Sequence, residues 1–574
     1  METVRVLRRA CLVGAAVVVA AITAANCGGG GGGGGASVTT GSSAGPGNPG
    51  ATGGSNTGGS GTTGSGSGTS SGGAAMAAAH DVLTYHTDIA RTGQNLNETT
   101  LTPANVTAST FGKVGFFTVD GKVDAQPLYV GSVAIAGGTH NVLYVVTEHD
   151  SVFALDADSG ATLWQTRTLK TGETPSDDRG CGQITQEIGI TSTPVIDRSR
   201  GANGTIYVVA MSKDASGNYH QRLHALDLAS GAERLNGPTE IAATYPAANG
   251  QVLFAPSLYA ERAGLLLLGG VVYTTWTSHC DAGTYTGWIM GYGADTLQQT
   301  TVLNVTPNGS GGAIWMAGAG PASDGASIYL LDGNGAFDTT LDANGFPNLR
   351  DFGNGFLKLG TAGGLSVSDY FAMSNVVEEA RDDIDLGSGG ALVLPDVTDA
   401  NGNVQQLALG AGKDNVIYVV NRNAMGKFNG ARDNIYQEIA SQLVGGEFGM
   451  PAYFNGRVYF GSVGDHLKAF TVSNAKLSAT PTAQTAMTFP YPGTTPSISA
   501  NGSANGIVWA AQNGNVAALH AFDPVSLNEL YNSNQMGARD QFGAGNKFIT
   551  PMIANGKVYV GTTDGVAVFG LLKG

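Results

Sequence analysis

Short runs of alternating apolar and polar residues, each centred on a large aromatic residue, recur through most of the chain. They are rich in β-branched residues and end at Gly-containing turns, which is the pattern of short, half-buried strands. The central aromatic residues are Tyr144, Tyr207, Tyr273, Tyr329, Tyr418, Tyr459, Trp509 and Tyr559. A proline often precedes the run, as at Pro194, Pro451, Pro496 and Pro551. Repetition every few tens of residues predicts a propeller or a related array.

Eight repeats predict an all-β fold, an eight-bladed β-propeller whose blades are four-stranded antiparallel sheets. The last repeat, 550–571, has material for only three strands. The segment 111–120 (FGKVGFFTVD) has no partner in its own repeat, so we predict that it supplies the outer strand of the last blade and closes the ring. Closure removes an exposed sheet edge. We expect loops at 171–188, 338–354 and 370–386, and an insertion in the blade between Tyr329 and Tyr418.

The N-terminal 79 residues do not share this pattern. Three arginines precede an apolar stretch at 10–25, which is typical of a signal peptide and short for a membrane-spanning helix. Cys27 follows at once and resembles the lipidated cysteine of a bacterial lipoprotein, although Asn26 departs from the usual small residue. Simple secretion and a retained anchor are the alternatives. We predict a signal peptide with a lipidation site at 1–27, a disordered Gly/Ser/Thr-rich tether at 28–79 and the propeller at 80–574.

Charge narrows the classes of partner. The 574 residues carry a formal net charge of −15, and Lys and Arg are few and scattered. The chain lacks the basic surface that a nucleic-acid-binding protein needs, which excludes that class of partner. An anionic membrane surface would repel the domain. We expect a small-molecule ligand or an envelope protein as partner, membrane attachment only through a lipid anchor, and a monomer. The predicted location is the periplasm or the cell surface.

Four cysteines are present, and two of them belong to the N-terminal segment. Cys181 and Cys280 remain after export, so we expect a disulfide between them in an oxidising compartment. The alternative is a reactive thiol at Cys280, beside His279. The chain has no CxxCH motif and therefore no sign of attached c-type haem.

From about residue 83 onward the chain resembles the quinoprotein alcohol dehydrogenase-like superfamily, whose propellers carry pyrroloquinoline quinone (PQQ) repeats. The resemblance rests on the leading segment 84–106 (TYHTDIARTGQNLNETTLTPANV) and on repeat endings such as 154–164 (ALDADSGATLW) and 225–235 (ALDLASGAERL). It implies the propeller fold strongly. It implies a function less strongly, because one fold hosts many functions.

The resemblance also assigns roles to single residues. Trp315, in GGAIWMAGAGP, stands where the family places the Trp that stacks on the quinone, and Lys413 matches a basic residue that contacts the quinone oxygens. Asn334 matches a calcium ligand, and Asp385 matches the catalytic base, which takes the proton of the substrate hydroxyl. A bound cation would polarise the quinone carbonyl.

Three departures from the family pattern concern the cofactor. The adjacent Cys pair of the family is reduced to Cys181 followed by Gly, and Glu187 stands near the place of an expected Arg. The family's calcium-binding Glu falls near Ser216, with Asp214 close by. A hard cation needs several oxygen ligands. The candidate ligands in this chain are Asn334, Asp385, Asp214 and Glu187.

Each candidate has a structural alternative. Trp315 could fill space between blades, the Asn334–Gly335 pair could form a strand-end turn, Asp385 could belong to a solvated acidic loop, and Lys413 could lie at the rim. We therefore predict an exported propeller that binds a ligand or partner and has a partly retained quinone pocket. For the cofactor, two expectations have equal weight: the protein binds PQQ with calcium, or it binds no cofactor. The second hypothesis is a divergent PQQ- and calcium-dependent dehydrogenase that oxidises alcohols or sugars.

Overall fold

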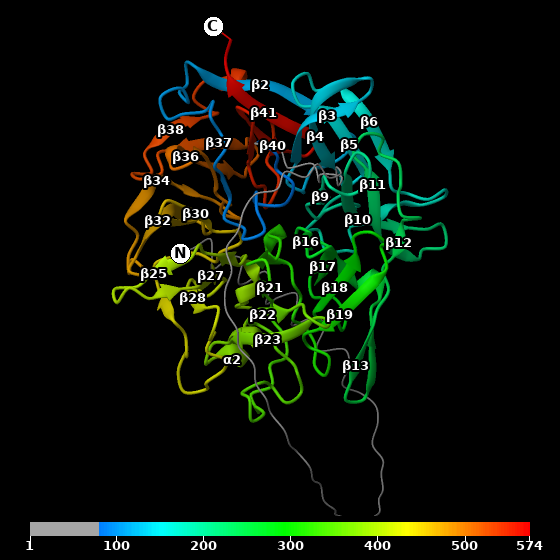
Figure 1. The fold of residues 1–574 in the computed structure, drawn as a ribbon, viewed down its shortest axis with the longest axis vertical. Helices are drawn as coiled ribbons and strands as arrows, with labels where there is room; N and C mark the ends of the chain where they lie inside the picture. Colours follow the sequence, from blue (N-terminus) through cyan, green and yellow to red (C-terminus); the bar gives the residue numbers. More distant parts are fainter. Residues whose placement is uncertain (1–79, 574) are drawn as a thin grey trace, which may run out of the picture. The chain divides into compact units, whose positions relative to one another are not determined.

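The structure, a computed structural model, describes residues 80–573. The predicted signal peptide, Cys27 and the tether lie outside the described residues. The described part forms an eight-bladed β-propeller of small antiparallel sheets, which follow one another around the ring in chain order (Figure 1). The predicted all-β fold is confirmed, and the α-helix of this part is confined to α2 (Val376–Arg381). No helix in residues 80–573 is long and apolar enough to cross a bilayer.

Blades 1 to 4 each place four strands in spatial order from the axis outward. Blade 1 contains β3 (Leu128–Ile135), β4 (Gly138–Val146), β5 (Ser151–Asp156) and β6 (Thr162–Arg167). Blade 2 contains β9 (Val195–Asp197), β10 (Thr205–Lys213), β11 (Tyr219–Asp227) and β12 (Thr239–Glu240), with β7 (Thr174–Asp177) and β8 (Glu187–Ile188) added. Blade 3 contains β16 (Leu266–Leu268), β17 (Val271–Ser278), β18 (Trp288–Gly293) and β19 (Gln299–Asn304), with β15 (Tyr259–Ala260) beside β17. Blade 4 contains β20 (Ala322–Ser323), β21 (Ser327–Leu331), β22 (Phe356–Gly360) and β23 (Ser366–Phe371).

Blades 5 to 8 repeat this arrangement. Blade 5 contains β24 (Leu392–Val393), β27 (Leu407–Ala411), β28 (Ile417–Asn421) and β29 (Gln437–Ile439). Blade 6 contains β30 (Ala452–Phe454), β31 (Arg457–Phe460), β32 (Asp465–Ser473) and β34 (Ala483–Phe489), with β33 (Lys476–Leu477) on β32. Blade 7 contains β35 (Ser497–Asn501), β36 (Ala504–Gln512), β37 (Ala518–Phe522) and β38 (Glu529–Asn532). Blade 8 contains β39 (Met552–Ala554), β40 (Lys557–Gly561), β41 (Gly565–Leu571) and β2 (Phe111–Thr118).

Short elements connect or extend the blades. Two separate hairpins pair β13 (Thr244–Ala247) with β14 (Gly250–Leu253), and β25 (Val397–Thr398) with β26 (Val404–Gln405). The 3-10 turns are η2 (Pro256–Leu258), η3 (Met316–Gly318), η4 (Leu386–Ser388) and η5 (Gly537–Arg539). Strand β1 (Gln94–Asn95) runs parallel to β35. Two of the expected loops contain regular structure: 171–188 includes β7 and β8, and 370–386 includes α2.

The repeated aromatic residue has a packing role. Seven of the eight lie in the second strand of a blade and are buried, which lets the ring pack against the neighbouring blade. Three of the tyrosine hydroxyls also donate to a backbone carbonyl of the next blade: Tyr144 to Leu228 (2.9 Å), Tyr207 to Ala294 (2.6 Å) and Tyr459 to Pro524 (2.7 Å). The repeat in the sequence is therefore a repeat of contacts between blades.

Blade 5 departs from the predicted register. Tyr418 lies on β28, which is the third strand of its blade, and the second strand, β27, has the sequence LALGA without an aromatic residue. The long step from Tyr329 to Tyr418 thus combines an insertion with a shift of one strand. The pattern around Tyr418 predicted a strand correctly but could not tell which strand of the blade it is.

The N-terminal strand closes the ring as predicted. Strand β2 pairs antiparallel with β41, from Phe111 opposite Leu571 onward, and forms the outer edge of blade 8 (Figure 1). Phe111 is fully buried against Trp509, Tyr531 and Phe569, with ring centroids 5.0 to 6.4 Å apart. Closure therefore joins blade 8 to blade 7 by aromatic packing as well as by strand pairing.

Residues 82–98, which we name the axial segment, touch the innermost part of all eight blades. Their hydrogen bonds to blades 1 to 4 join Val82 with Tyr129, Leu83 O with Ile196 N, Arg91 with Leu265 O, and Ile89 O with Ser323 N. Their hydrogen bonds to blades 5 to 8 join Ala90 O with Val393 N, Thr92 O with Tyr453 N, Gly93 O with Ile498 N, and Asn95 with Ile553 O. The axial segment therefore holds the blades together around the axis.

Candidate functional site

The prolines of the repeat mark a set of residues around the axis. In each blade this proline lies just before the first strand, and blades 3 and 5 have another residue in its place. We consider the residue three positions before it, which lies ahead of the first strand. These axial positions are Asp124, Thr191, Arg262, Gly318, Ser388, Phe448, Gly493 and Phe548. All except Ser388 line one of two pockets that share Phe548. We name these two pockets, together with the polar cluster described next, the funnel.

The structure brings four of the sequence-predicted residues together. Asp385 Oδ1 accepts a hydrogen bond from Trp315 Nε1 (3.2 Å), and Asp385 Oδ2 forms an ion pair with Lys413 Nζ (2.6 Å). Lys413 Nζ also donates to Asp383 Oδ1 (2.7 Å), which accepts from Asn334 Nδ2 (2.9 Å). The result is a continuous polar chain from Asn334 to Trp315, which we name the polar cluster.

Blades 4 and 5 supply this cluster from their inner loops. Trp315 precedes β20 and Asn334 follows β21, whereas Asp385 precedes β24 and Lys413 follows β27. Gly335 lets the loop of Asn334 approach the chain ahead of Trp315, because a Cβ there would lie 2.3 Å from the nitrogen of Gly312. The four side chains converge because these loops lie at the same end of two adjacent blades.

The backbone of the cluster is strained. Met316 (φ 38°) and Ala317 (φ 51°) directly follow Trp315, and Asp383 (φ 60°) lies in the loop of Asp385. Left-handed conformations cost residues other than Gly roughly 1–2 kcal/mol each. Such strain persists where the surrounding structure overdetermines it, and it gathers at binding and catalytic sites. The same left-handed backbone also occurs at turns elsewhere in the described part, such as Asn455 and Asn555, so here it marks two tight loops.

Lys413 neutralises the buried acid of the cluster. Asp385 is 3% exposed, and burial raises its pKa above the ordinary value although Lys413 opposes the shift. Burial lowers the pKa of Lys413, but the charges of Asp385 and Asp383 outweigh it and raise the pKa overall. The Lys413 ammonium therefore stays charged and bridges two carboxylates, which is a position that a metal ion could otherwise take.

Trp315 does not pack between blades but belongs to a closed cycle of four aromatic rings. Its centroid lies 5.9 Å from that of Phe448 and 6.2 Å from that of Phe548. Tyr491 completes the cycle at 5.8 Å from Phe448 and 6.4 Å from Phe548. Trp315 is partly exposed and Tyr491 is 45% exposed. We name these four residues the aromatic quartet; Phe448 and Phe548 line the pockets, and Trp315 and Tyr491 pack beside them.

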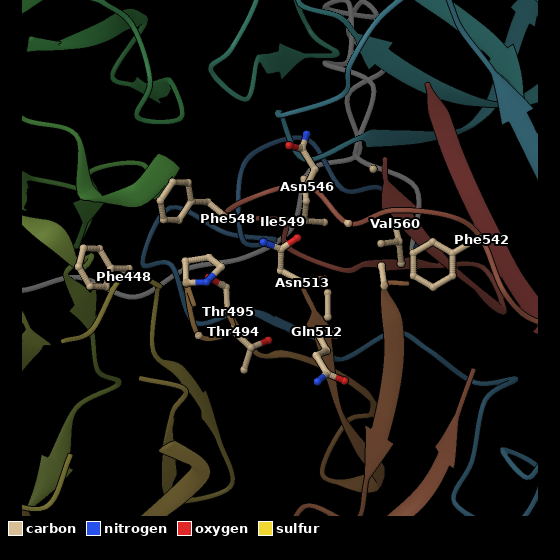
Figure 2. A pocket seen from close by; sticks show the side chains of 16 residues that line it. Phe448, Thr494, Thr495, Gln512, Asn513, Phe542, Asn546, Phe548, Ile549 and Val560 are labelled. Carbon is tan, nitrogen blue, oxygen red and sulfur yellow. The ribbon is translucent and has the colours of Figure 1, made fainter. Parts of the chain in front are cut away.

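The larger pocket of the funnel has a neutral lining. It lies between blades 6, 7 and 8 and is partly open to solvent, and Phe448, Phe542 and Phe548 line it together with polar side chains (Figure 2). Thr494 is 5% exposed, and its hydroxyl has no hydrogen-bond partner among residues 80–573. The Asn513 side chain also lines the pocket (Figure 2). The pocket therefore offers the unpaired Thr494 hydroxyl beside aromatic walls.

The sequence did not single out Phe448, Thr494 or Phe548. A signal was nevertheless present, because Phe448 and Phe548 stand three residues before a repeat proline, as Asp124 and Thr191 do. The sequence could not show that this position faces the axis until the ring was closed.

Of the four predicted calcium ligands, Asn334 and Asp385 share the polar cluster, whereas Glu187 and Asp214 lie elsewhere. Glu187 forms an ion pair with His149 (2.8 Å) at blade 1, on the opposite side of the ring from blade 5. Asp214 caps the turn between β10 and β11, where hydrogen bonds from Asn218 and Ser216 lower its pKa to about 2. Within residues 80–573, no group of three or more His, Cys, Asp and Glu side chains is arranged to hold a metal ion. The residues present do not fit a calcium ion.

Cys181 and Cys280 form a disulfide, with their Cα atoms 5.5 Å apart. Cys181 lies in the loop between β7 and β8, and Cys280 follows β17. The bond therefore joins blade 2 to blade 3 and closes a long loop of chain, which restricts the unfolded state. It also occupies the thiol that a reactive Cys280 would need.

Comparison with solved structures finds the same fold in quinone-dependent enzymes. The quinohemoprotein alcohol dehydrogenase of Comamonas testosteroni superposes with a TM-score of 0.58 at 14% identity, over 87% of this chain and 81% of that one. The quinohemoprotein alcohol dehydrogenase ADHIIG of Pseudomonas putida HK5 gives 0.55 at 12% identity, over 86% and 80%. A europium-containing methanol dehydrogenase gives 0.54 at 12% identity, over 86% and 98%.

The chain thus has the propeller fold of the quinoprotein alcohol dehydrogenases. Identities of 12–14% support the fold alone. No protein-family model matches the chain, and no curated protein matches it in a sequence comparison. The function must therefore be argued from the funnel itself.

Proposed function

We propose that this protein is a ligand-binding propeller that holds a small planar ring compound against Trp315 in the funnel. The observation that carries the proposal is the polar cluster, in which Asp385, Lys413, Asp383 and Asn334 form one hydrogen-bonded chain ending on the Trp315 indole. This chain fixes the edge of Trp315, so that its ring can serve as a rigid stacking surface. The Asn334 Oδ1 atom is buried without a partner in the described part and can accept a hydrogen bond from a ligand.

The ligand would bind without a metal ion. Lys413 already supplies the positive charge beside Asp385, and Glu187 and Asp214 are engaged elsewhere. A ring compound with carboxylate or carbonyl oxygens fits an ammonium group and an aromatic face together. PQQ is such a compound, and the shared fold makes it the natural probe.

Replacing Trp315 by Ala in the full-length protein tests the proposal. Stacking on an aromatic side chain contributes about 1–3 kcal/mol, so we expect Trp315→Ala to weaken PQQ binding by about 5-fold to 150-fold in isothermal titration calorimetry. The matched control is Trp164→Ala. Trp164 is partly buried on β6, packs on Tyr144 and donates to Leu228 O, away from the funnel. The proposal is wrong if the wild-type protein binds no PQQ, or if the two variants weaken binding equally.

A divergent PQQ-dependent dehydrogenase is the second candidate. The observation in its favour is that burial raises the pKa of Asp385, which makes its carboxylate a better proton acceptor than an exposed Asp. Oxidation of an alcohol or sugar in the presence of PQQ, calcium and an artificial electron acceptor would establish this activity. Loss of turnover in Asp385→Asn with PQQ binding retained would assign the base.

We further propose that the protein is exported and anchored through Cys27, at the periplasmic or cell-surface side of a membrane, as the N-terminal pattern indicates. Monomeric behaviour and an envelope protein as additional partner remain proposals of the same kind.

A further inference from the structure

We infer that the funnel contains an oxyanion-binding site built around Arg262, at the axis of the propeller. The inference deepens the proposed function and rests on it, because it names the charge of the ligand that the funnel would take. It arises from a feature that the fold itself does not explain, namely a buried arginine without a hydrogen-bonded partner.

Arg262 is 8% exposed, yet no described side chain or carbonyl accepts a hydrogen bond from its guanidinium, and its Nε atom is fully buried. Its close neighbour is the ring of Phe548, whose centroid lies 4.7 Å from Cζ. An arginine has five N–H donors and stays charged, and buried charges in proteins are ordinarily paired. The guanidinium has no hydrogen-bonded acceptor, although the Asp124 carboxylate lines the same pocket and interacts with its charge, so a bound anion could supply the missing acceptor.

The arginine faces a cavity. Arg262 lines a small pocket, partly open to solvent, together with residues of blades 1, 2, 4 and 8. Tyr85 of the axial segment lies on the wall of this pocket, and its hydroxyl hydrogen bonds with Thr550 (3.2 Å). Hydroxyl and amide groups of Thr191, Thr193 and Gln126 also line it. The space is suited to a small polar group, such as a carboxylate, rather than to a whole ring system.

The charges around the cavity favour an anion, in contrast to the acidic protein as a whole. Lys122 forms an ion pair with Asp124 (3.1 Å), and Lys547 donates to Gln183 (3.0 Å). Burial, followed by the nearby charges of Arg262 and Lys122, lowers the pKa of Lys547. Like charges that lie near one another are stabilised when an anion enters between them.

The acids nearby do not cancel this excess. Burial would raise the pKa of Asp124, but Lys122 and further partners outweigh it and lower the pKa, so that Asp124 is ionised. Burial and then the charge of Asp124 raise the pKa of Glu148 far above its usual range, which disfavours a second negative charge beside Asp124. One carboxylate thus faces three cations, Lys122, Arg262 and Lys547, and a net positive charge remains at the axis.

The ligand chemistry is that of an oxyanion, supplied either by the carboxylate of an organic compound or by free phosphate. An arginine binds both in a bidentate manner. The Phe548 ring over the guanidinium is shared with the aromatic quartet, so a ring compound stacked on Trp315 could direct a carboxylate toward Arg262.

The test compares anion binding by the full-length wild type with that of Arg262→Met. The probes are sodium phosphate and sodium benzoate, measured by thermal unfolding and calorimetry against sodium chloride at equal ionic strength. We expect at least one probe to raise the melting temperature of the wild type saturably, and Arg262→Met to lose this response. We expect Arg262→Lys, which keeps the charge but not the fork of donors, to bind at least about tenfold more weakly.

The control is Arg350→Met, because Arg350 also lies over a phenylalanine ring but is exposed and paired with Asp342. In chloride alone, Arg262→Met should melt close to the wild type, since it removes a buried guanidinium without hydrogen-bonded acceptors but also takes one cation away from Asp124. A response to benzoate alone would show that the site takes an organic carboxylate. A response to phosphate would show that it also takes the free inorganic anion.

Absence of any response in the wild type, or an unchanged response in Arg262→Met, would overturn the inference. Failure of the proposed function is distinguishable from this result. In that case Trp315→Ala would leave PQQ binding unaffected, while the small anions would still depend on Arg262.

Discussion

Arg91→Met is expected to lower the free energy of unfolding by at least about 4 kcal/mol, or to prevent folding. Arg91 is fully buried, and its guanidinium donates to Thr84 Oγ1, Tyr85 O, Leu265 O and Pro321 O at 2.7 to 3.1 Å. Losing the donor leaves four buried acceptors unsatisfied, each costing about 1–3 kcal/mol. Because these acceptors belong to the axial segment and to blades 3 and 4, the variant should loosen the axis of the ring. Chemical denaturation followed by circular dichroism measures the effect.

The control for Arg91 is Arg381→Met. The Arg381 side chain is 68% exposed on α2, so the same substitution should change the unfolding free energy by no more than about 0.5 kcal/mol. If Arg91→Met does not yield soluble protein, Arg91→Lys, which keeps the charge, provides the measurable intermediate. Equal stability of Arg91→Met and Arg381→Met would show that the axial segment does not hold the blades together.

Glu447→Gln is expected to change how stability depends on pH. Glu447 is fully buried beside Phe448, and its carboxyl oxygens form no well-placed hydrogen bond in residues 80–573, although the backbone N–H groups of Gly449 and Gly461 lie near enough to favour the ionised form slightly. Burial, followed by the charge of Asp465, raises its pKa to about 8. The native state therefore keeps the proton at neutral pH, where the unfolded state has released it. This carboxyl group costs stability as the pH rises from the unfolded pKa toward 8, by about 1.4 kcal/mol per pH unit.

The measurement is the unfolding free energy of the wild type and Glu447→Gln at pH 5 and pH 8. We expect the stability of the variant relative to the wild type to increase by up to about 4 kcal/mol over this interval. Glu378→Gln, on the exposed face of α2, is the control and should follow the wild type. Parallel pH profiles for wild type and Glu447→Gln would contradict the account of Glu447 as a protonated buried acid.

The sequence predicts the fold well because each blade repeats one local pattern. Strand alternation around residues such as Tyr144 and Tyr559, and the unpaired segment at 111–120, were sufficient to predict the blades and the ring closure. The position of Tyr418 on the third strand of blade 5 was not predictable, because the pattern of a single strand does not show whether it is the first, second or third strand of its sheet. The helix α2 within an expected loop was missed for a similar reason, since it is only 6 residues long.

The site was predictable only where a family resemblance supplied positions. Trp315, Asn334, Asp385 and Lys413 converge, and their ion pair and hydrogen bonds could not be derived from spacing in the chain. No sequence pattern around Arg262 points to a binding site. Its interest comes from the absence of a hydrogen-bonded acceptor for its guanidinium in the described part, which can be seen only once all the blades are in place.

The central claim is that the funnel binds a planar, oxygen-rich ligand with Lys413 in place of a metal ion. Calorimetric titration of the full-length protein with PQQ, once in calcium and once in excess EDTA, tests it most directly. The account predicts saturable binding in both buffers, with dissociation constants that agree within about twofold, far less than the tenfold that 1.4 kcal/mol represents. Binding that appears only in calcium, or no binding in either buffer, would contradict it.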